Sequence, residues 1–223
     1  MKPAGIIALF IFICCGEQAY SQTNSFTPEW SYGVNGGATF SKVGFNSYIS
    51  VPQNLLRQYS GGLTVRYISE NHFGIQVELN YSQRGWKERT DTIHINRYAR
   101  SIAYLEVPVM THIYFNLAKP LRLIFNLGPQ FGYYLNQKEI ERNILENPDP
   151  DIEAVYYDDP VQKPFDYGLK GGMGFEFRTK KSSIILDLRY YFGLSDVFNN
   201  AKKDWFQASN NRVIGLNLTY LFR

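Results

Sequence analysis

Apolar and polar residues alternate along most of this chain with a period of two. The clearest stretch is residues 212–222, in which one face is wholly apolar and ends in aromatic residues: Ile214, Leu216, Leu218, Tyr220 and Phe222. The other face is mostly small or polar. A period of two is the spacing of side chains on a β-strand, whereas a helix repeats every 3.6 residues. The chain is therefore predicted to end in a strand.

The same alternation predicts eight strands in all. Each segment has one apolar face, and no ten-residue amphipathic helix competes with any of them. The predicted strands are 30–41, 61–69, 73–84, 101–115, 121–135, 166–177, 183–192 and 212–222. The fold class predicted is therefore all-β.

The links between these segments alternate strictly in length. Three are short, at 69–72, 116–120 and 179–182, and the four others are long, at 42–60, 85–100, 137–164 and 193–211. Short turns in the periplasm and long loops outside are typical of outer-membrane barrels with an even number of strands. The pattern predicts an eight-stranded antiparallel up-and-down transmembrane β-barrel with long extracellular loops.

The N-terminus has the form of a secretory signal peptide. Lys2 gives a positive start, residues 4–15 are an apolar run, and Ala19 and Ser21 form a small-x-small cleavage site. We predict a signal peptide over 1–21, a short periplasmic segment over 22–29, and the barrel domain over 30–223. A lipoprotein anchored through Cys15 is the alternative, although the residues before Cys15 make a poor lipobox.

Two arrangements of the barrel faces fit the alternation. In a soluble carrier barrel the apolar face lines the interior, and the charged face is an ordinary surface. The secretory leader, the asymmetric loops and the aromatic strand ends instead favour lipid around the apolar face. We then expect a narrow lumen, filled by a network of paired charges: Arg66, Glu78, Glu106, Lys170, Glu176, Asp187 and Arg189.

Composition removes several function classes. The formal net charge of +3, without a basic cluster, does not indicate nucleic-acid binding. Mean hydropathy is −0.29, and beyond the leader no run approaches 18 apolar residues, so helical membrane spans are not expected. Both cysteines, Cys14 and Cys15, lie in the predicted leader, so the mature chain would hold together without disulfides.

Candidate chemistry is sparse. Of the three histidines, His72 is in a predicted turn, His112 points into the predicted lumen, and only His94 lies in an outer loop, without a serine at a telling spacing. The carboxylate-rich loop 146–153 lacks the glycine and spacing of a calcium-binding EF-hand loop. We expect no catalytic, cofactor-binding or metal site. Aromatic residues in or beside outer loops could bind a ligand or anchor at the interface: Trp86, Tyr156, Tyr157, Trp205 and Phe206.

An ordered set of motifs resembles the PorT-like outer membrane β-barrel family of Bacteroidetes. The motifs are YLEVPV (104–109), LGP (127–129), DYG (166–168) and LRYYFGL (188–194), with ELNYSQRGW (78–86) also fitting. The resemblance spans nearly the whole mature chain and implies an integral outer-membrane barrel. It brings no catalytic residues, and one branch of the family is associated with type IX secretion.

The predicted role is structural or interactive, exerted through the extracellular loops and without catalysis. An accessory part of the type IX secretion system, a lipid-modifying enzyme and a narrow channel are the alternatives. Expected partners are outer-membrane lipid, a protein at the outer loops and, during insertion, the barrel assembly machinery. The assembly machinery would act on a C-terminal strand signal formed by Leu218, Tyr220 and Phe222. The protein is expected to be a monomer.

Overall fold

The computed structural model describes residues 26–46, 53–88, 97–143, 160–198 and 208–223. These ranges hold nine strands and no helix able to cross a membrane. The strands are β1 (Glu29–Asn46), β2 (Gln53–Asn54), β3 (Leu56–Glu70), β4 (Phe73–Glu88), β5 (Arg97–Ala118), β6 (Leu121–Asn143), β7 (Phe165–Arg178), β8 (Ser182–Asp196) and β9 (Ala208–Phe222).

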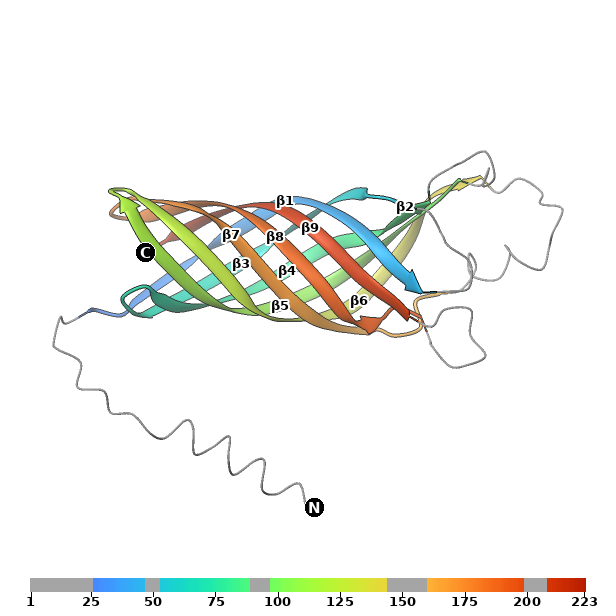
Figure 1. Ribbon diagram of the computed structural model, residues 1–223, viewed down its shortest axis with the longest axis horizontal. Helices are drawn as coiled ribbons and strands as arrows, with labels where there is room; N and C mark the ends of the chain where they lie inside the picture. Colours follow the sequence, from blue (N-terminus) through green and yellow to red (C-terminus); the bar gives the residue numbers. More distant parts are fainter. Residues whose placement is uncertain (1–25, 47–52, 89–96, 144–159, 199–207) are drawn as a thin grey trace, which may run out of the picture.

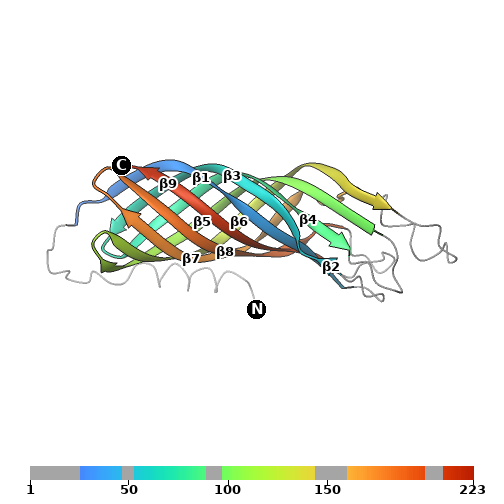
Figure 2. The same cartoon turned by 90° about the horizontal axis from the view of Figure 1, so that it is seen from above.

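Eight long strands close into a barrel (Figure 1). Each pairs antiparallel with its neighbours in the chain, β9 pairs with β1, and β2 adds only a two-residue ladder to the end of β4. Viewed from above, the strands are steeply tilted around the axis (Figure 2). The predicted eight-stranded antiparallel up-and-down barrel is confirmed.

The two ends of the barrel differ. The short links β3–β4, β5–β6 and β7–β8 lie at the end that also carries Glu29 and Arg223 (Figure 1). In outer-membrane barrels such short turns face the periplasm. We refer to this end as the periplasmic mouth and to the opposite one as the outer end.

Several strands run further toward the outer end than the sequence predicts. β6 was expected to stop at Leu135 but continues to Asn143, and β5 begins at Arg97 instead of residue 101. The link from β6 to β7 therefore starts after Asn143, not at Gln137. The reason is that the β5–β6 ladder continues to the pair Arg97 and Asn143 after the apolar alternation has ended. The alternation of apolar and polar residues reflects contact with lipid, whereas the β5–β6 ladder is formed by backbone hydrogen bonds.

The apolar face points outward. Phe175, Leu186 and Leu216 are each about half exposed, while Lys170 and Arg189 are buried inside the barrel. On β4 the apolar outward residues run from Phe73 to Tyr81, which at about 3.3 Å per residue and a tilt of about 40° makes a band about 23 Å high. That height matches a membrane-spanning belt. The outward direction of the apolar face rules out the soluble-carrier arrangement, in which that face would line the interior.

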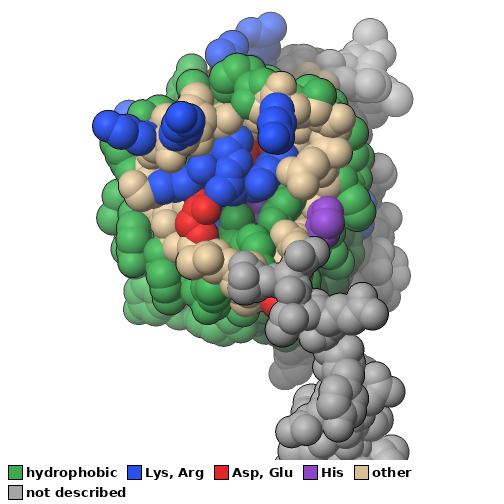
Figure 3. Space-filling view, turned by 90° about the vertical axis from the view of Figure 1, so that its left-hand side faces the viewer, with side chains coloured by type: hydrophobic (Ala, Val, Ile, Leu, Met, Phe, Trp, Pro, Cys, Tyr) green, Lys and Arg blue, Asp and Glu red, His purple; other side chains and the backbone are tan. Residues whose placement is uncertain are grey.

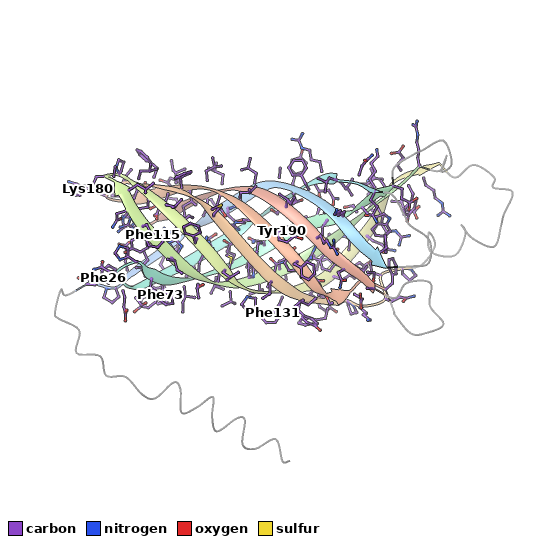
Figure 4. All side chains as sticks on the ribbon, in the orientation of Figure 1. Phe26, Phe73, Phe115, Phe131, Lys180 and Tyr190 are labelled. Atoms are coloured by element: carbon purple, nitrogen blue, oxygen red, sulfur yellow. The ribbon has the colours of Figure 1, made fainter. Side chains whose placement is uncertain are left out.

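Aromatic side chains border this belt. At the periplasmic end the rings of Trp30 and Tyr67 lie 4.6 Å apart, and those of Tyr220 and Phe222 lie 4.7 Å apart. Phe73 and Phe115 project from the same half of the barrel (Figure 4). Amphipathic aromatic rings are favoured at the two membrane–water interfaces. On β9, Leu218, Tyr220 and Phe222 all face outward, between β8 and β1.

Candidate functional site

The candidate site is the interior of the barrel, where charged and polar side chains gather. Because alternate residues of each strand point inward, the polar side chains of all the strands enter one narrow space. The seven residues predicted for the lumen are each at most 9% exposed. They come from β3, β4, β5, β7 and β8, and all lie inside the barrel: Arg66, Glu78, Glu106, Lys170, Glu176, Asp187 and Arg189.

Arg189 is the first centre of this network. Its Nη1 donates a hydrogen bond to Glu78 Oε2 at 2.8 Å across the barrel, and its Nε contacts the carboxylate of Asp187 on the same strand. Glu78 also accepts hydrogen bonds from the amides of Gln76 (2.7 Å) and Asn80 (2.9 Å). Both carboxylates therefore have partners, which a buried charge requires.

Arg84 is the second centre. Its Nη1 donates to Asp166 Oδ2 at 2.8 Å, and its Nη2 lies 3.0 Å from Glu106 Oε1. The guanidinium lies between two aromatic rings, 4.0 Å from the centroid of Tyr104 and 4.8 Å from that of Tyr191. Stacking on aromatic faces suits the planar, weakly hydrated guanidinium.

Asp166 collects several further donors. The hydroxyls of Tyr191 and Ser195 donate to it at 2.5 Å and 2.7 Å, and the amide of Asn211 donates at 3.3 Å. Lys170 Nζ lies farther from its partner, 3.8 Å from Glu106 Oε2. Of the predicted charges, Lys170 therefore has the loosest partner in the barrel centre.

A separate group lies nearer the periplasmic mouth. Arg66 Nη2 donates to Glu176 Oε1 at 2.8 Å, and its Nη1 lies 3.1 Å from His112 Nε2. The other ring nitrogen of His112 lies 2.8 Å from Asn126 Oδ1. Since both ring nitrogens are engaged and the ring is buried, His112 is part of the packing.

The network is balanced in charge and leaves little space. Its five cations are Arg66, Arg84, Arg122, Lys170 and Arg189, and its five carboxylates are Glu78, Glu106, Asp166, Glu176 and Asp187. The cavity between Ser82, Gln130, Lys170 and Asn217 has a volume of about 30 Å³. Such a volume is close to that of one water molecule. An eight-stranded barrel has an interior just wide enough for side chains to fill.

Glycine on β7 makes room for the charges on β8. Gly174 lies opposite Asp187, and a Cβ added there would come within 2.6 Å of the Asp187 Cβ and 2.2 Å of the Leu186 carbonyl oxygen. At Gly172 an added Cβ would lie 3.2 Å from the Arg189 Cγ. Inward-facing glycine is thus required where two neighbouring strands would otherwise compete for the lumen.

Apolar clusters lie on both sides of the charged layer. The cluster at the outer end consists of Val43, Trp86, Tyr98, Ile102, Tyr104, Val197 and Phe198. The cluster at the periplasmic mouth consists of Ile68, Tyr114, Ile124, Ile185 and Leu221, with Phe26 packed against it. The central charges therefore lie between two apolar clusters, while Arg122 and Glu176 extend to the periplasmic mouth, a layering that the sequence did not predict.

Trp86 requires a correction. Its proposed position in or beside an outer loop, with a role as an interfacial anchor, is wrong, because the side chain is 0% exposed and packs inside the barrel against Tyr98 and Phe198. β4 continues past residue 84, so Trp86 keeps the inward parity of Glu78 and Ser82. Its indole forms part of the lid over the lumen.

Sequence reasoning also overlooked members of the network. Arg84, Asp166 and Tyr191 have inward parity, but Arg84 stood at a predicted strand end and Asp166 at a predicted strand start. Both lie at terminal positions of the predicted strands 73–84 and 166–177, so their inward parity could be read from the sequence. Their pairing across the barrel could not be found, because it depends on the register of strands distant in sequence.

The remaining candidate residues do not form a site within the described ranges. His72 lies in the short β3–β4 turn and stacks on Tyr114 with ring centroids 5.5 Å apart. The described residues contain no group of three or more histidine, cysteine or acidic side chains able to hold a metal. Outside the described residues lie His94, the loop 146–153, Tyr156, Tyr157, Trp205 and Phe206.

Comparison with known structures finds several outer-membrane proteins. The outer membrane protein OprG from Pseudomonas aeruginosa is 12% identical, with a TM-score of 0.50 over 86% of this chain and 96% of its own. Neisserial surface protein A is 9% identical, with a TM-score of 0.47 over 88% and 99%. The attachment invasion locus protein Ail of Yersinia pestis is 14% identical, with a TM-score of 0.39 over 87% and 99%. At such identities the likeness to OprG concerns the fold.

Sequence comparison gives the family. No curated protein sequence matches this chain. A family model described as outer membrane protein beta-barrel domain matches residues 20–199, which is well over half of the chain. The protein therefore belongs to the outer membrane protein beta-barrel domain family and resides in the outer membrane.

Proposed function

We propose that this protein is a closed outer-membrane barrel that acts as an interaction platform at its outer end. The observation that carries the proposal is the filled lumen, whose central cavity is only about 30 Å³. Five cations and five carboxylates occupy the interior, and an apolar cluster lies toward each of its ends. A barrel filled in this way favours a closed lumen over transport through it.

The outer end has features that suit binding. β5 and β6 continue beyond the apolar belt as a paired ladder that carries polar and charged residues, among them Lys138 and Glu141. Lys87 Nζ joins this ladder to β4 through a 2.9 Å contact with Glu141. Below it, Trp86 and Phe198 fix the strand ends that lead to the loops. A rigid base lowers the entropy that a binding surface loses when a partner docks.

Site-specific photo-crosslinking tests this proposal. A crosslinking amino acid at Ile140, which is exposed beyond the belt, should form protein adducts in native membranes. The same group at Leu188, in the middle of the belt, is the matched control and should react with lipid only. Equal adducts at both positions, or none at Ile140, would contradict an outer-end platform.

Electrical recording tests the closed lumen separately. The full-length protein in a planar bilayer should give no steady conductance at neutral pH. A reproducible open level would instead support the narrow-channel alternative and remove the closed lumen from the proposal.

An accessory role in type IX secretion is a second candidate. It is supported by the motifs YLEVPV (104–109) and LRYYFGL (188–194), which resemble the PorT-like family. Co-purification with secretion components, together with loss of secretion on deletion of the gene, is the expected result. Normal secretion in the deletion strain would eliminate this role.

A lipid-modifying activity has weaker support. His112 is held by Arg66 and Asn126 inside the barrel, so it is out of reach of a lipid substrate. His94 is the only histidine in a predicted outer loop of the sequence. Comparison of lipid A from wild-type and His94→Ala strains tests the idea, and identical lipid A would end it.

A further inference from the structure

The periplasmic mouth contrasts with the balanced lumen, because it carries a surplus of positive charge. Besides Arg122 and Glu176, which also belong to the lumenal network, its cationic side chains are Lys119, Arg178, Lys180, Lys181 and Arg223, and its carboxylate side chains among the described residues are Glu29 and Glu70. Figure 3 looks onto this end and shows lysine and arginine gathered across the middle of the mouth. Residues 22–25 of the preceding segment carry no charge.

The carboxylates at the mouth are shared between arginines. Glu29 lies 2.6 Å from Arg178 Nη2 and 2.9 Å from Arg223 Nε. Glu176 is already paired with Arg66, and it lies 4.0 Å from Arg122 Nη1 and 3.8 Å from Arg223 Nη2. Each of these two acids therefore faces more than one guanidinium, and positive charge remains uncompensated.

Two further observations indicate unused capacity for an anion. In the described part of the chain Arg122 Nη1 has no hydrogen-bond partner, although its Nε donates to Asn116 Oδ1 at 2.8 Å. Burial and the neighbouring Arg178 guanidinium lower the pKa of Arg223, which lies beyond the end of β9. An anion placed among these groups would relieve the repulsion that crowding creates.

These groups surround a hollow of about 800 Å³ between the β5–β6 and β7–β8 turns. Its lining combines cations with apolar residues of the rim, namely Leu117, Lys119, Leu121, Arg178, Lys180 and Arg223. Leu117 is more than half exposed and lies at the membrane edge of the barrel. Lys180 stands at the tip of its turn (Figure 4). The hollow thus joins a cationic floor to the lipid-facing surface.

We propose that this hollow binds the phosphate headgroup of an anionic phospholipid from the periplasmic leaflet. Lys119, Lys180 and Arg178 surround the phosphate, and an acyl chain follows Leu117 and Leu121 along the rim. A soluble anion would use the cations but not the apolar rim, which is why the lining favours a lipid. Basic pockets at membrane surfaces recognise anionic headgroups by this combination of charge and position.

Native mass spectrometry of the full-length barrel in a neutral detergent tests the proposal. The probes are a short-chain phosphatidylglycerol, a phosphatidylcholine with the same chains, and inorganic phosphate. Wild-type protein should retain phosphatidylglycerol at least tenfold more tightly than phosphatidylcholine. The double variant K119Q/K180Q should weaken phosphatidylglycerol binding about 30-fold, since each lysine near a membrane surface contributes about a fivefold factor.

The double variant K42Q/K138Q is the matched control, because it removes the same charge from exposed positions toward the outer end. It should retain phosphatidylglycerol as wild type does, and gel migration with and without heating should show both variants folded. Equal retention of the two lipids, an equal loss in the control, or phosphate binding as tight as lipid binding would each overturn the proposal. The last result would leave a site for soluble anions.

Discussion

The two faces of strand β8 carry opposite chemistry on one backbone. Leu186, Leu188 and Tyr190 are each about half exposed on the outside, whereas Asp187 and Arg189 between them are buried in the lumen. A soluble protein places these residue types the other way round. The comparison teaches that the barrel wall separates two environments, lipid outside and paired charges inside. Substitutions on the two faces should therefore change the stability of the protein for different reasons.

The largest effect is expected on the inner face. Arg189→Ala leaves Glu78 and Asp187 without their cation in a closed space, which should lower the free energy of unfolding by about 3–5 kcal/mol. Urea unfolding in detergent micelles measures it. The triple variant E78Q/D187N/R189M, which replaces all three charges with neutral side chains, should recover most of the loss, because neither carboxylate is left without its cation. A triple variant as unstable as the single one would contradict this explanation.

On the outer face, a charged side chain should destabilise the protein because it would contact lipid. Leu188→Arg lies near the middle of the apolar belt and should cost about 2–4 kcal/mol of folding free energy in bilayers. Ile140→Arg is the matched control, since Ile140 is equally exposed but beyond the belt. Its effect should stay below about 0.5 kcal/mol. Similar losses at both positions would mean that the belt is wrongly placed.

Crowding of the backbone should have a smaller effect on stability, and it should again differ between the inner and outer faces. Gly174→Ala places a methyl group 2.6 Å from the Asp187 Cβ and 2.2 Å from a backbone oxygen, and should destabilise by about 1–3 kcal/mol. At Gly171 the nearest atom to an added Cβ is the Leu127 Cδ1, at 3.4 Å. Gly171→Ala should therefore be close to neutral in the same unfolding measurement. A tolerated Gly174→Ala would show that the lumen can relax.

The smallest effect is expected where the inner face reaches water. Glu29→Gln breaks the contacts with Arg178 and Arg223, but these side chains are partly exposed and the loss should be only about 0.2–1 kcal/mol. Glu78→Gln, in the sealed centre, is the comparison and should cost more. If the two substitutions have equal effects, then the lumen is better hydrated than its packing indicates.

The alternation predicted the strands well in their middle parts and poorly at their ends. In β4 it gave the inward parity of Glu78 but stopped at residue 84, so Trp86 was assigned to the wrong environment. In β6 it ended at Leu135, although the ladder continues to Asn143. The physical reason is that the pattern records contact with lipid, and strands beyond the belt pair without it.

The interior was predictable as a class of residues but not as an arrangement. Parity alone places Arg66, Glu106 and Lys170 in the lumen. Arg84 between Tyr104 and Tyr191, by contrast, follows from side chains brought together by strands 20 to 107 residues apart in sequence. No local pattern encodes which carboxylate meets which guanidinium, because ring closure and register determine those distances.

The sequence by itself determined the eight long strands and their order, because both depend on a period of two and on link lengths that can be read along one dimension. Its leader, loop asymmetry and aromatic strand ends favoured lipid around the apolar face. Only the tertiary structure decided that the lumen is layered, how its charges pair, and that positive charge accumulates at the periplasmic mouth. Those properties arise when eight walls meet around one axis, and electrostatic energy depends on distances across that axis.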